Sequence, residues 1–349
     1  PTDWHVMSVG RYAAGGAGLV FVESTKVERR GCGTVGDLGL WNDEFIPYFK
    51  KLSDFIRMYG SCRGIQLGHS GRKARRYRPW EGGKPLDPLP EIEDWDSWEL
   101  VSSTGEGDPG DPLPRSLSVD EVQDIVQKWG DAAERANKAG FDVLEIHAAH
   151  GYLIHQFLSP HVNRRNDRYG GSEENRMRFA LEIVEAVRSQ WPDGKPLFVR
   201  LSVEDDAGWG PDENVRLSVL LKQKGVDVID CSAGGITGAP AFRAKDDGTP
   251  IKSSGERPRG FQVPYASEIK KEAEIKTMAV GRIIDAEQAE AILRDRDADL
   301  IGIGRELMYN PFWGLHAAET LKNETALEGW PDQYRWAITR RADLEKNDR

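Results

Sequence analysis

The chain has 349 residues, of which 39% are hydrophobic, and it carries a formal net charge of −10. This size can bury the core of one barrel-sized domain or of two smaller ones. The acidic balance argues against nucleic acid or an anionic membrane surface as the main partner, since both favour a basic face. No apolar run approaches the roughly 18 residues that a membrane span needs. We therefore expect a cytoplasmic protein that acts on a small molecule.

The three cysteines give no sign of a metal centre or of a disulfide framework. Cys32, Cys62 and Cys231 are widely spaced. They form no C-x-x-C pair, and zinc and iron–sulfur sites commonly use pairs of that spacing. We therefore expect a reducing compartment and no metal.

Short β-rich runs recur along the chain and alternate with helical patterns. The runs lie at 18–24, 63–69, 141–148, 196–202, 226–232, 277–282 and 299–305. Between them, apolar residues recur with helical spacing at 42–59 and 118–139. Ser118 and Glu121 have the spacing of a helical capping box. Strictly alternating strands and helices are typical of parallel βα units, so the pattern predicts an α/β fold and, at this length, a (β/α)8 TIM barrel.

The first recognisable element, at 3–14, is a helix rather than a strand. An eight-fold barrel would therefore need one more strand upstream of Pro1, and we predict that the first strand is missing from this chain. Residues 1–320 are expected to form the barrel domain, and residues 321–349 a C-terminal tail.

Two long connections interrupt the βα pattern. The segment 74–116, rich in Pro, Gly, Asp and Trp, follows the second predicted strand, and we expect it to cap the catalytic face of the barrel. The segment 233–263 follows the strand at 226–232. Connections of this length in a compact domain are more often functional than idle, so both segments are candidates to cover a ligand.

Two imidazoles and a phenol gather where the strand at 141–148 ends. His147, His150 and Tyr152 lie within six residues of one another, and barrel enzymes keep their chemistry at the carboxyl ends of their strands. Neutral imidazoles can hydrogen-bond a carbonyl or nitro oxygen, and a phenol can supply a proton. Structural histidines and a metal site are the alternatives, although a third metal ligand of suitable spacing is lacking. The cluster predicts an enzyme that polarises a small electrophile.

Two Gly–Arg pairs, Gly281–Arg282 and Gly304–Arg305, follow the last two predicted strands. Barrels often hold a phosphate with the loops at these positions. A glycine lets backbone N–H groups approach an anion, and an arginine offers a fork that matches phosphate oxygens. Either pair alone could be a strand-end glycine beside a solvated arginine. Two copies in the two expected positions favour a phosphorylated cofactor.

Polar side chains also stand at or just beyond other strand ends. The Gln66 amide could bind the edge of a planar heterocycle, and Arg200 could stabilise negative charge there. Alternatively, Gln66 is a polar residue of a barrel layer. Lys73 could form a Schiff base, and this keeps an aldolase or isomerase open as a rival barrel enzyme; a solvated loop charge is the other interpretation of Lys73.

Several motifs together resemble those of the Old Yellow Enzyme family, which are FMN-dependent ene-reductases with an eight-fold barrel. These motifs lie at 15–19, 66–73, 147–153, 157–160 and 163–172, and the resemblance runs from Thr2 to about Trp313. The chain is most similar to the xenobiotic-reductase-like bacterial branch, because His150 stands where the yeast-type enzymes have asparagine.

The resemblance implies FMN as cofactor and NADH or NADPH as co-substrate. The residues that it places against FMN are Ser24, Gln66, Arg200, Gly281, Arg282, Gly304 and Arg305. The last two Gly–Arg pairs would lie at the phosphate, in agreement with the barrel argument. In this family the first strand also carries flavin contacts, so a chain without it could be a catalytically impaired flavin-binding scaffold.

The resemblance also assigns the substrate side of the site. His147 and His150 would hold the carbonyl or nitro oxygen of an activated alkene. Flavin N5 would deliver hydride to the alkene, and Tyr152 would donate the proton. Trp80 and Trp313 are two further candidates that could narrow the substrate pocket. The segment 333–336 resembles one that reaches into a neighbouring subunit's site in related enzymes, which suggests a homodimer or homotetramer.

Overall fold

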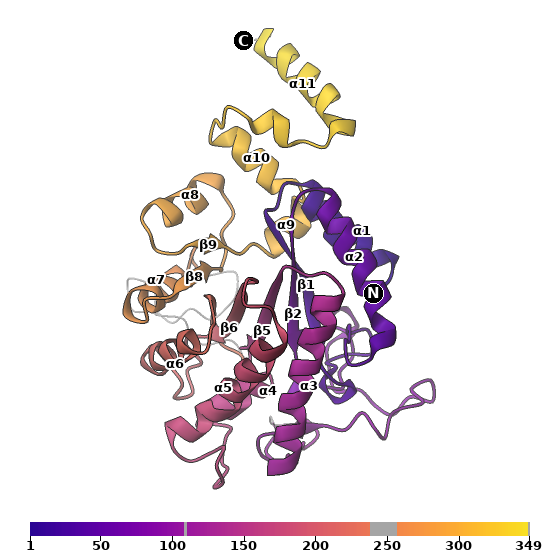
Figure 1. Ribbon diagram of the computed structural model, residues 1–349, viewed down its shortest axis with the longest axis vertical. Helices are drawn as coiled ribbons and strands as arrows, with labels where there is room; N and C mark the ends of the chain where they lie inside the picture. Colours follow the sequence, from indigo (N-terminus) through magenta and orange to yellow (C-terminus); the bar gives the residue numbers. More distant parts are fainter. Residues whose placement is uncertain (108–109, 238–256, 348–349) are drawn as a thin grey trace.

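The computed structural model describes residues 1–107, 110–237 and 257–347, and a curved, fully parallel sheet forms its centre (Figure 1). The strand order is β1-β2-β5-β6-β7-β8-β9. The bounds are β1 (Leu19–Lys26), β2 (Cys62–Gly68), β5 (Val143–Ala148), β6 (Leu197–Ser202), β7 (Val228–Ser232), β8 (Lys276–Ala279) and β9 (Leu300–Ile301). Each of the seven predicted β-rich runs overlaps one of these strands, which confirms the predicted α/β barrel architecture.

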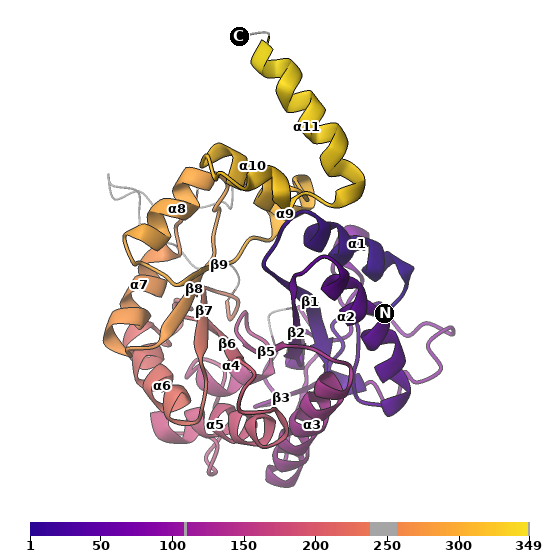
Figure 2. The ribbon, with the colours of Figure 1, turned by 45° about the horizontal axis from the view of Figure 1, so that its top comes forward.

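Helices surround the outer face of the curved sheet (Figure 2). The bounds of the helices, including α11 outside this layer, are α1 (Asp3–Ala14), α2 (Ile46–Met58), α3 (Val119–Lys138), α4 (Leu153–Leu158), α5 (Glu173–Gln190), α6 (Pro211–Gln223), α7 (Val263–Glu272), α8 (Ala286–Arg294), α9 (Arg305–Tyr309), α10 (Trp313–Thr320) and α11 (Asp332–Asn347). The predicted capping box starts α3, because Ser118 Oγ accepts from Glu121 N at 3.2 Å and Glu121 Oε2 accepts from Ser118 N at 2.9 Å. In the described residues no helix is long and apolar enough to cross a membrane.

The main core lies between the sheet and these helices. The buried face of α2 carries Phe49, Leu52 and Ile56, all fully buried, as its helical spacing predicts. Each such side chain contributes roughly 1.5–3 kcal/mol relative to full exposure.

A second apolar cluster fills the amino end of the barrel interior. It consists of Val143, Phe198, Val228 and Met278, with the partly buried Leu19 and Phe21 packed against them. The rings of Phe21 on β1 and Phe198 on β6 are 5.8 Å apart, although β2 and β5 separate these strands in the sheet. The two rings therefore meet across the inside of the curved sheet.

Side-chain alternation makes the other end of the same interior polar. Residues two apart on a strand share a face, so Val143 on β5 is followed inside the barrel by Glu145 and His147. On β7, Asp230 and Ser232 lie in the same way beyond Val228. All of these polar residues are buried. The carboxyl end of the barrel is thus a buried polar site above an apolar floor.

Within the described residues, the sheet is open between β1 and β9, so the barrel has seven strands, as predicted. The turn before β1 packs directly against the segment that begins α10: Leu315 N donates to Gly15 O at 3.2 Å. A Cβ on Gly15 would overlap the carbonyl oxygen of Pro311. Glycine is required here because the two backbones touch.

The inserted segment 74–116 folds over one side of the barrel. It contains the short strands β3 (Val101–Ser102) and β4 (Arg115–Ser116). Ser102 Oγ and Ser103 Oγ donate to the side-chain and backbone oxygens of Gln156, each at 2.9 Å. Gln156 Nε2 in turn donates to Gly151 O at 2.6 Å, so the insertion contacts the loop beyond β5. The other long connection, 233–263, lies mostly outside the described residues.

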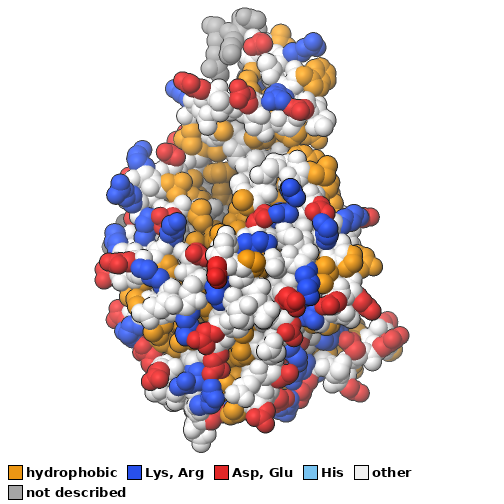
Figure 3. Space-filling view, in the orientation of Figure 1, with side chains coloured by type: hydrophobic (Ala, Val, Ile, Leu, Met, Phe, Trp, Pro, Cys, Tyr) orange, Lys and Arg blue, Asp and Glu red, His pale blue; other side chains and the backbone are white. Residues whose placement is uncertain are grey.

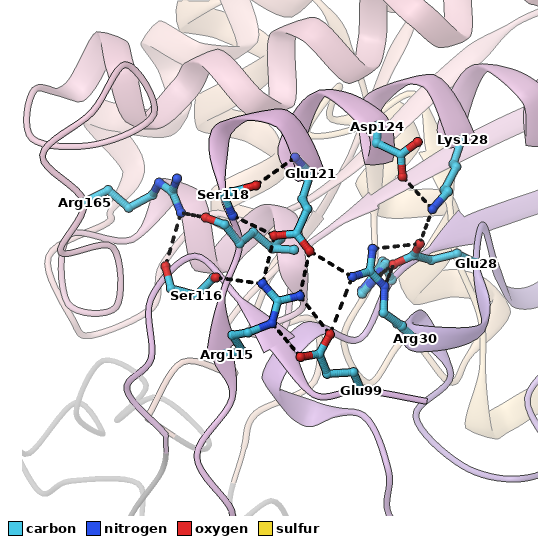
Figure 4. A network of polar contacts seen from close by, with 12 residues as sticks. Glu28, Arg30, Glu99, Arg115, Ser116, Ser118, Glu121, Asp124, Lys128 and Arg165 are labelled. Carbon is cyan, nitrogen blue, oxygen red and sulfur yellow. Dashed lines mark hydrogen bonds and ion pairs between the residues drawn. The ribbon is translucent and has the colours of Figure 1, made fainter. Parts of the chain in front are cut away.

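An ion-pair network holds this insertion to the helical layer (Figure 4). The guanidinium of Arg115 bridges Glu99 in the insertion and Glu121 at the start of α3, with N–O distances of 2.5 to 2.8 Å. Arg30, beyond β1, pairs with Glu28 at 2.8 Å and extends the network to the end of that strand. The pairs of Arg115 are partly exposed, so each is worth at most about 1 kcal/mol, whereas Glu28 is buried.

The C-terminal helix α11 projects away from the barrel (Figure 1, Figure 2). The space-filling view shows hydrophobic side chains between this segment and the barrel, while charges of both signs are mixed over the rest of that face (Figure 3). The rings of Phe312, just before α10, and Trp330, just before α11, stack with their centroids 5.4 Å apart. This contact attaches the start of the α11 segment to the start of α10.

Candidate active site

The three residues predicted to do the chemistry meet where β5 ends. His147 Nε2 and His150 Nδ1 are 3.2 Å apart. The Tyr152 ring lies beside the His147 ring, with centroids 4.7 Å apart. His147 is buried, and His150 and Tyr152 are partly exposed. One imidazole pair and one phenol therefore share a single site.

The loop that carries His150 has a strained backbone. His150 has φ 57° and Gly151 has φ 71°, and positive φ is uncommon in a residue other than glycine. The bend is fixed by two side chains. Ser202 Oγ accepts from His150 N at 2.9 Å, and Lys73 Nζ donates to His150 O at 2.9 Å and to Gly235 O.

Lys73 therefore braces two loops. Its amine is engaged with the two carbonyl groups, so the structure gives no support to the Schiff-base alternative.

Burial keeps both imidazoles neutral. The pKa of His147 is lowered well below its usual value, first by burial and then by the charges of His150, Arg200 and Lys26. The pKa of His150 is also lowered well below its usual value, by burial and by the charge of Arg200. A neutral imidazole has one N–H donor and one acceptor nitrogen. His150 Nε2 also lies 2.7 Å from Ser232 Oγ.

This neutrality predicts a flat pH profile for ligand binding. Because both pKa values lie below the ordinary 6.5, the pair gains protons only at lower pH. We expect the dissociation constant of cyclohexenone, titrated against the oxidised FMN-loaded protein by visible absorbance, to change less than about twofold from pH 6.5 to pH 8. A tenfold change across this interval would show that one imidazole titrates there.

A row of polar side chains crosses the barrel interior next to the histidines. Gln66 Nε2 donates to Glu145 Oε1 at 2.7 Å, and Arg200 Nε lies 3.1 Å from Asp230 Oδ2. Strand register aligns these pairs, since Gln66 is opposite Glu145 and Arg200 is opposite Asp230. Burial, with the charge of Asp230, raises the pKa of Glu145 to about 8. Glu145 is therefore mostly protonated at pH 7.

Some hydrogen-bonding capacity in this row is unused. Glu145 Oε2 and Asp230 Oδ1 are buried and have no hydrogen-bond partner among the described residues. Buried polar atoms are normally satisfied. The row therefore fits a polar heterocycle.

The two predicted Gly–Arg pairs are brought together by a third arginine. Arg282 donates to the backbone oxygen of Arg257. Burial, and then the positive charge of Arg305, lower the pKa of Arg257. Gly281 and Arg282 both have positive φ, 110° and 54°. Arg282 and Arg305 follow the neighbouring strands β8 and β9, and together with Arg257 they form a cradle that favours an anion.

Arg257 was missed by the sequence analysis, because no local spacing relates it to residues 282 and 305. Gln262, five residues after Arg257, connects this cradle to the histidine end of the site. Gln262 Nε2 donates to Ser232 Oγ at 3.1 Å, and Ser232 Oγ contacts His150.

Lys26 is a second residue that the sequence analysis missed. It ends β1, its side chain is 2% exposed, and its Nζ donates to Ser24 Oγ at 2.9 Å. Its Nζ is 5.1 Å from the centroid of the Tyr152 ring. The available signal was its position: residues two apart on a strand face the same side, so Lys26 accompanies the predicted flavin contact Ser24.

The two aromatic candidates are not brought to the histidine pair. Trp80, on the turn Pro79–Glu81, is 80% exposed. The Trp313 indole donates to Ile284 O at 2.6 Å, near the loop that carries Arg282. Their substrate-binding role stays a prediction. Among the residues that the structure describes, no cluster of three or more side chains could hold a metal ion.

An open parallel barrel with a buried polar site at its carboxyl end places the chain in the class of α/β-barrel enzymes. The chain belongs to the NADH:flavin oxidoreductase / NADH oxidase family, whose model matches residues 2–324. FMN is the cofactor of this family, and the resemblance to Old Yellow Enzymes is confirmed.

Curated relatives and solved structures agree with this assignment. The NADPH dehydrogenase of Bacillus pumilus (strain SAFR-032) is 43% identical over 324 residues, covering 92% of this chain and 85% of the relative. That of Bacillus subtilis (strain 168) is 41% identical over 325 residues, covering 93% and 86%. Morphinone reductase matches with a TM-score of 0.73 and 26% identity, covering 92% of this chain and 81% of that one. An Old Yellow Enzyme homologue from Zymomonas mobilis, 24% identical, shares the fold with a TM-score of 0.71, covering 95% and 90%.

Proposed function

We propose that this chain is an FMN-dependent NAD(P)H oxidoreductase that reduces activated alkenes, such as enones, and also nitro compounds. The observation that carries the proposal is the neutral pair of His147, which is buried, and His150, which is partly exposed, beside Tyr152. This pair lies in the same barrel interior as the row of Gln66 and Arg200.

The residues present fit FMN. The unpartnered oxygens of Glu145 and Asp230 mark a polar row with capacity to spare, and Gln66 and Arg200 are its donors toward a ring system. The cradle of Arg257, Arg282 and Arg305 would hold the phosphate, with Gly281 and Gly304 admitting it to the backbone. Ser24 would contact the ring edge from β1. When bound, FMN supplies the hydride chemistry that connects NAD(P)H to the alkene.

The protein's own residues orient and activate the substrate. Neutral His147 and His150 would exchange the contacts that they make with each other and with Ser232 for hydrogen bonds to the carbonyl or nitro oxygen. These bonds would draw electron density away from the double bond. Tyr152 supplies the proton that the α carbon needs once the β carbon has gained hydride. The apolar floor and the buried surroundings of His147 keep water from competing for this oxygen.

The test is the visible absorption spectrum of the purified protein, with FMN added back if it emerges colourless. We expect a bound flavin that bleaches under anaerobic NADPH and regains its colour when cyclohexenone is added. A folded protein that captures FMN but is not reoxidised by an enone would favour the flavin-binding scaffold instead. A folded protein that captures no FMN would contradict both.

Homo-oligomeric assembly and a cytoplasmic location stay predictions. The projecting helix α11 supports assembly, because it presents Tyr334 and Trp336 at 51% and 61% exposure, and exposed aromatic residues are enriched at interfaces.

A further inference from the structure

Lys26 is a buried cation whose ammonium group faces the substrate end of the site. A Cβ placed on Gly68 would lie 3.8 Å from Lys26 Nζ and 3.7 Å from the Cβ of His147. The Tyr152 ring is 5.1 Å from the same Nζ. Lys26, His147 and Tyr152 therefore lie close together around Gly68, where any side chain would overlap Ser24 Oγ.

The charge of Lys26 is only partly balanced. Asp37 Oδ2 lies 3.5 Å from Nζ. The same carboxylate already accepts from Gly33 N at 2.7 Å, from Thr34 N at 3.1 Å and from Thr34 Oγ1 at 2.7 Å. Asp37 is thus mainly engaged in bracing its own loop. It gives Lys26 a long ion pair rather than a close one.

The ammonium group retains donor capacity. An ammonium has three N–H donors, and its polar neighbours in the part of the chain described are Ser24 Oγ at 2.9 Å and Asp37. Burying a cation with incomplete pairing is costly. Such a group is more readily explained by a ligand than by stability, because a buried methionine would fill the same space without that cost.

Neighbouring cations are engaged elsewhere. Arg200 pairs with the buried Asp230 at 3.1 Å, and Lys73 donates to the carbonyls of His150 and Gly235. The two histidines are neutral. Lys26 is the cation of this group that lies beside Tyr152. Its charge can therefore distinguish an anionic substrate from a neutral one.

Building on the proposed function, we propose that Lys26 is a specificity-determining residue that binds a carboxylate substituent of the activated alkene. His147 and His150 would hold the activating carbonyl or nitro oxygen of that same molecule. The substrate class is then an enone or nitroalkene that carries a carboxylate close to its double bond.

The test compares cyclohexenone with cyclohexenone that carries a carboxylate on its β carbon. Oxidised, FMN-loaded protein is titrated with each at low ionic strength, and the dissociation constants are read from the visible absorbance of the bound flavin. We expect the carboxylate to bind about 10-fold or more tightly than the neutral enone, as a hydrogen bond between charged groups allows.

Three variants separate a specificity role from a structural one. In Lys26→Met the preference should fall to about twofold or less, and Lys26→Arg should keep most of it, since both charge and donors remain. Asp37→Asn should increase the preference, because the competing anion is removed. A loss of stability alone would leave the ratio of the two constants unchanged.

Equal affinity of the unmodified protein for both ligands would overturn the inference, and so would an undiminished preference in Lys26→Met. If Lys26→Met fails to retain FMN, the comparison between the unmodified protein and Asp37→Asn decides the question. The inference is then overturned if the preference for the carboxylate ligand is no greater in Asp37→Asn than in the unmodified protein. Failure of a different kind is distinguishable, since a flavin that cyclohexenone does not reoxidise contradicts the proposed function itself.

Discussion

Replacement of Tyr152 by phenylalanine should slow reoxidation of the reduced protein by an enone about 100-fold or more, because a general acid contributes roughly 10²–10⁴ to a rate. The phenyl ring keeps the contact with the His147 ring at 4.7 Å, so the histidine pair should stay in place. Reduction of the bound flavin by NADPH requires no proton from this residue and should change less than about threefold. Anaerobic stopped-flow absorbance measures the two half-reactions separately.

Tyr48→Phe is the matched control, since Tyr48 is 59% exposed on α2 and should leave both half-reactions unchanged. An equal loss in the two half-reactions of Tyr152→Phe would contradict the proton-donor role and point to a disturbed flavin site. Unchanged enone reduction would mean that water or another group supplies the proton.

Local sequence rules predicted the barrel because each rule acts within one element. Strand runs, helical spacing and the Ser118 capping box depend on neighbours a few residues apart, and these elements formed where expected. The cluster of His147, His150 and Tyr152 was also predictable, since all three lie at one strand end.

Contacts between distant loops were not predictable in the same way. Arg282 and Arg305 come together because β8 and β9 lie side by side in the sheet, and Arg257 joins them through the connection before α7, where Arg282 donates to its backbone oxygen. The exposure of Trp80 depends on the path of the insertion, which composition does not specify. Lys26 was overlooked because a lysine normally indicates a solvated position, whereas here the strand places it inside the barrel.

Glu145 illustrates how the fold creates a chemical state that the sequence does not display. It is an ordinary acidic residue in an apolar strand, yet the register sets it opposite Gln66 and near Asp230. Burial and that second carboxylate raise its pKa to about 8, so it can act as a hydrogen-bond donor at neutral pH. The polar row can therefore offer donors as well as acceptors to a heterocycle.

Removing two arginines of the cradle should weaken FMN binding strongly. Each hydrogen bond to a charged group contributes roughly 1.5–3 kcal/mol, so Arg282→Ala combined with Arg305→Ala should cost about 3–6 kcal/mol, which is roughly 10²–10⁴ in the dissociation constant. Quenching of flavin fluorescence on titrating the FMN-free protein measures this constant. Riboflavin, which lacks the phosphate, should bind the variant and the unmodified protein with similar affinity.

Arg259→Ala is the control for the loss of a nearby positive charge, because Arg259 lies two residues from Arg257, is exposed and pairs with Asp285. It should retain FMN affinity within about threefold, since a surface ion pair is worth at most about 1 kcal/mol. Equal losses for FMN and riboflavin in the double variant would mean that the loops beyond β8 and β9 had lost their structure. An unchanged FMN constant would show that the phosphate lies elsewhere and that Arg282 serves to hold the backbone oxygen of Arg257.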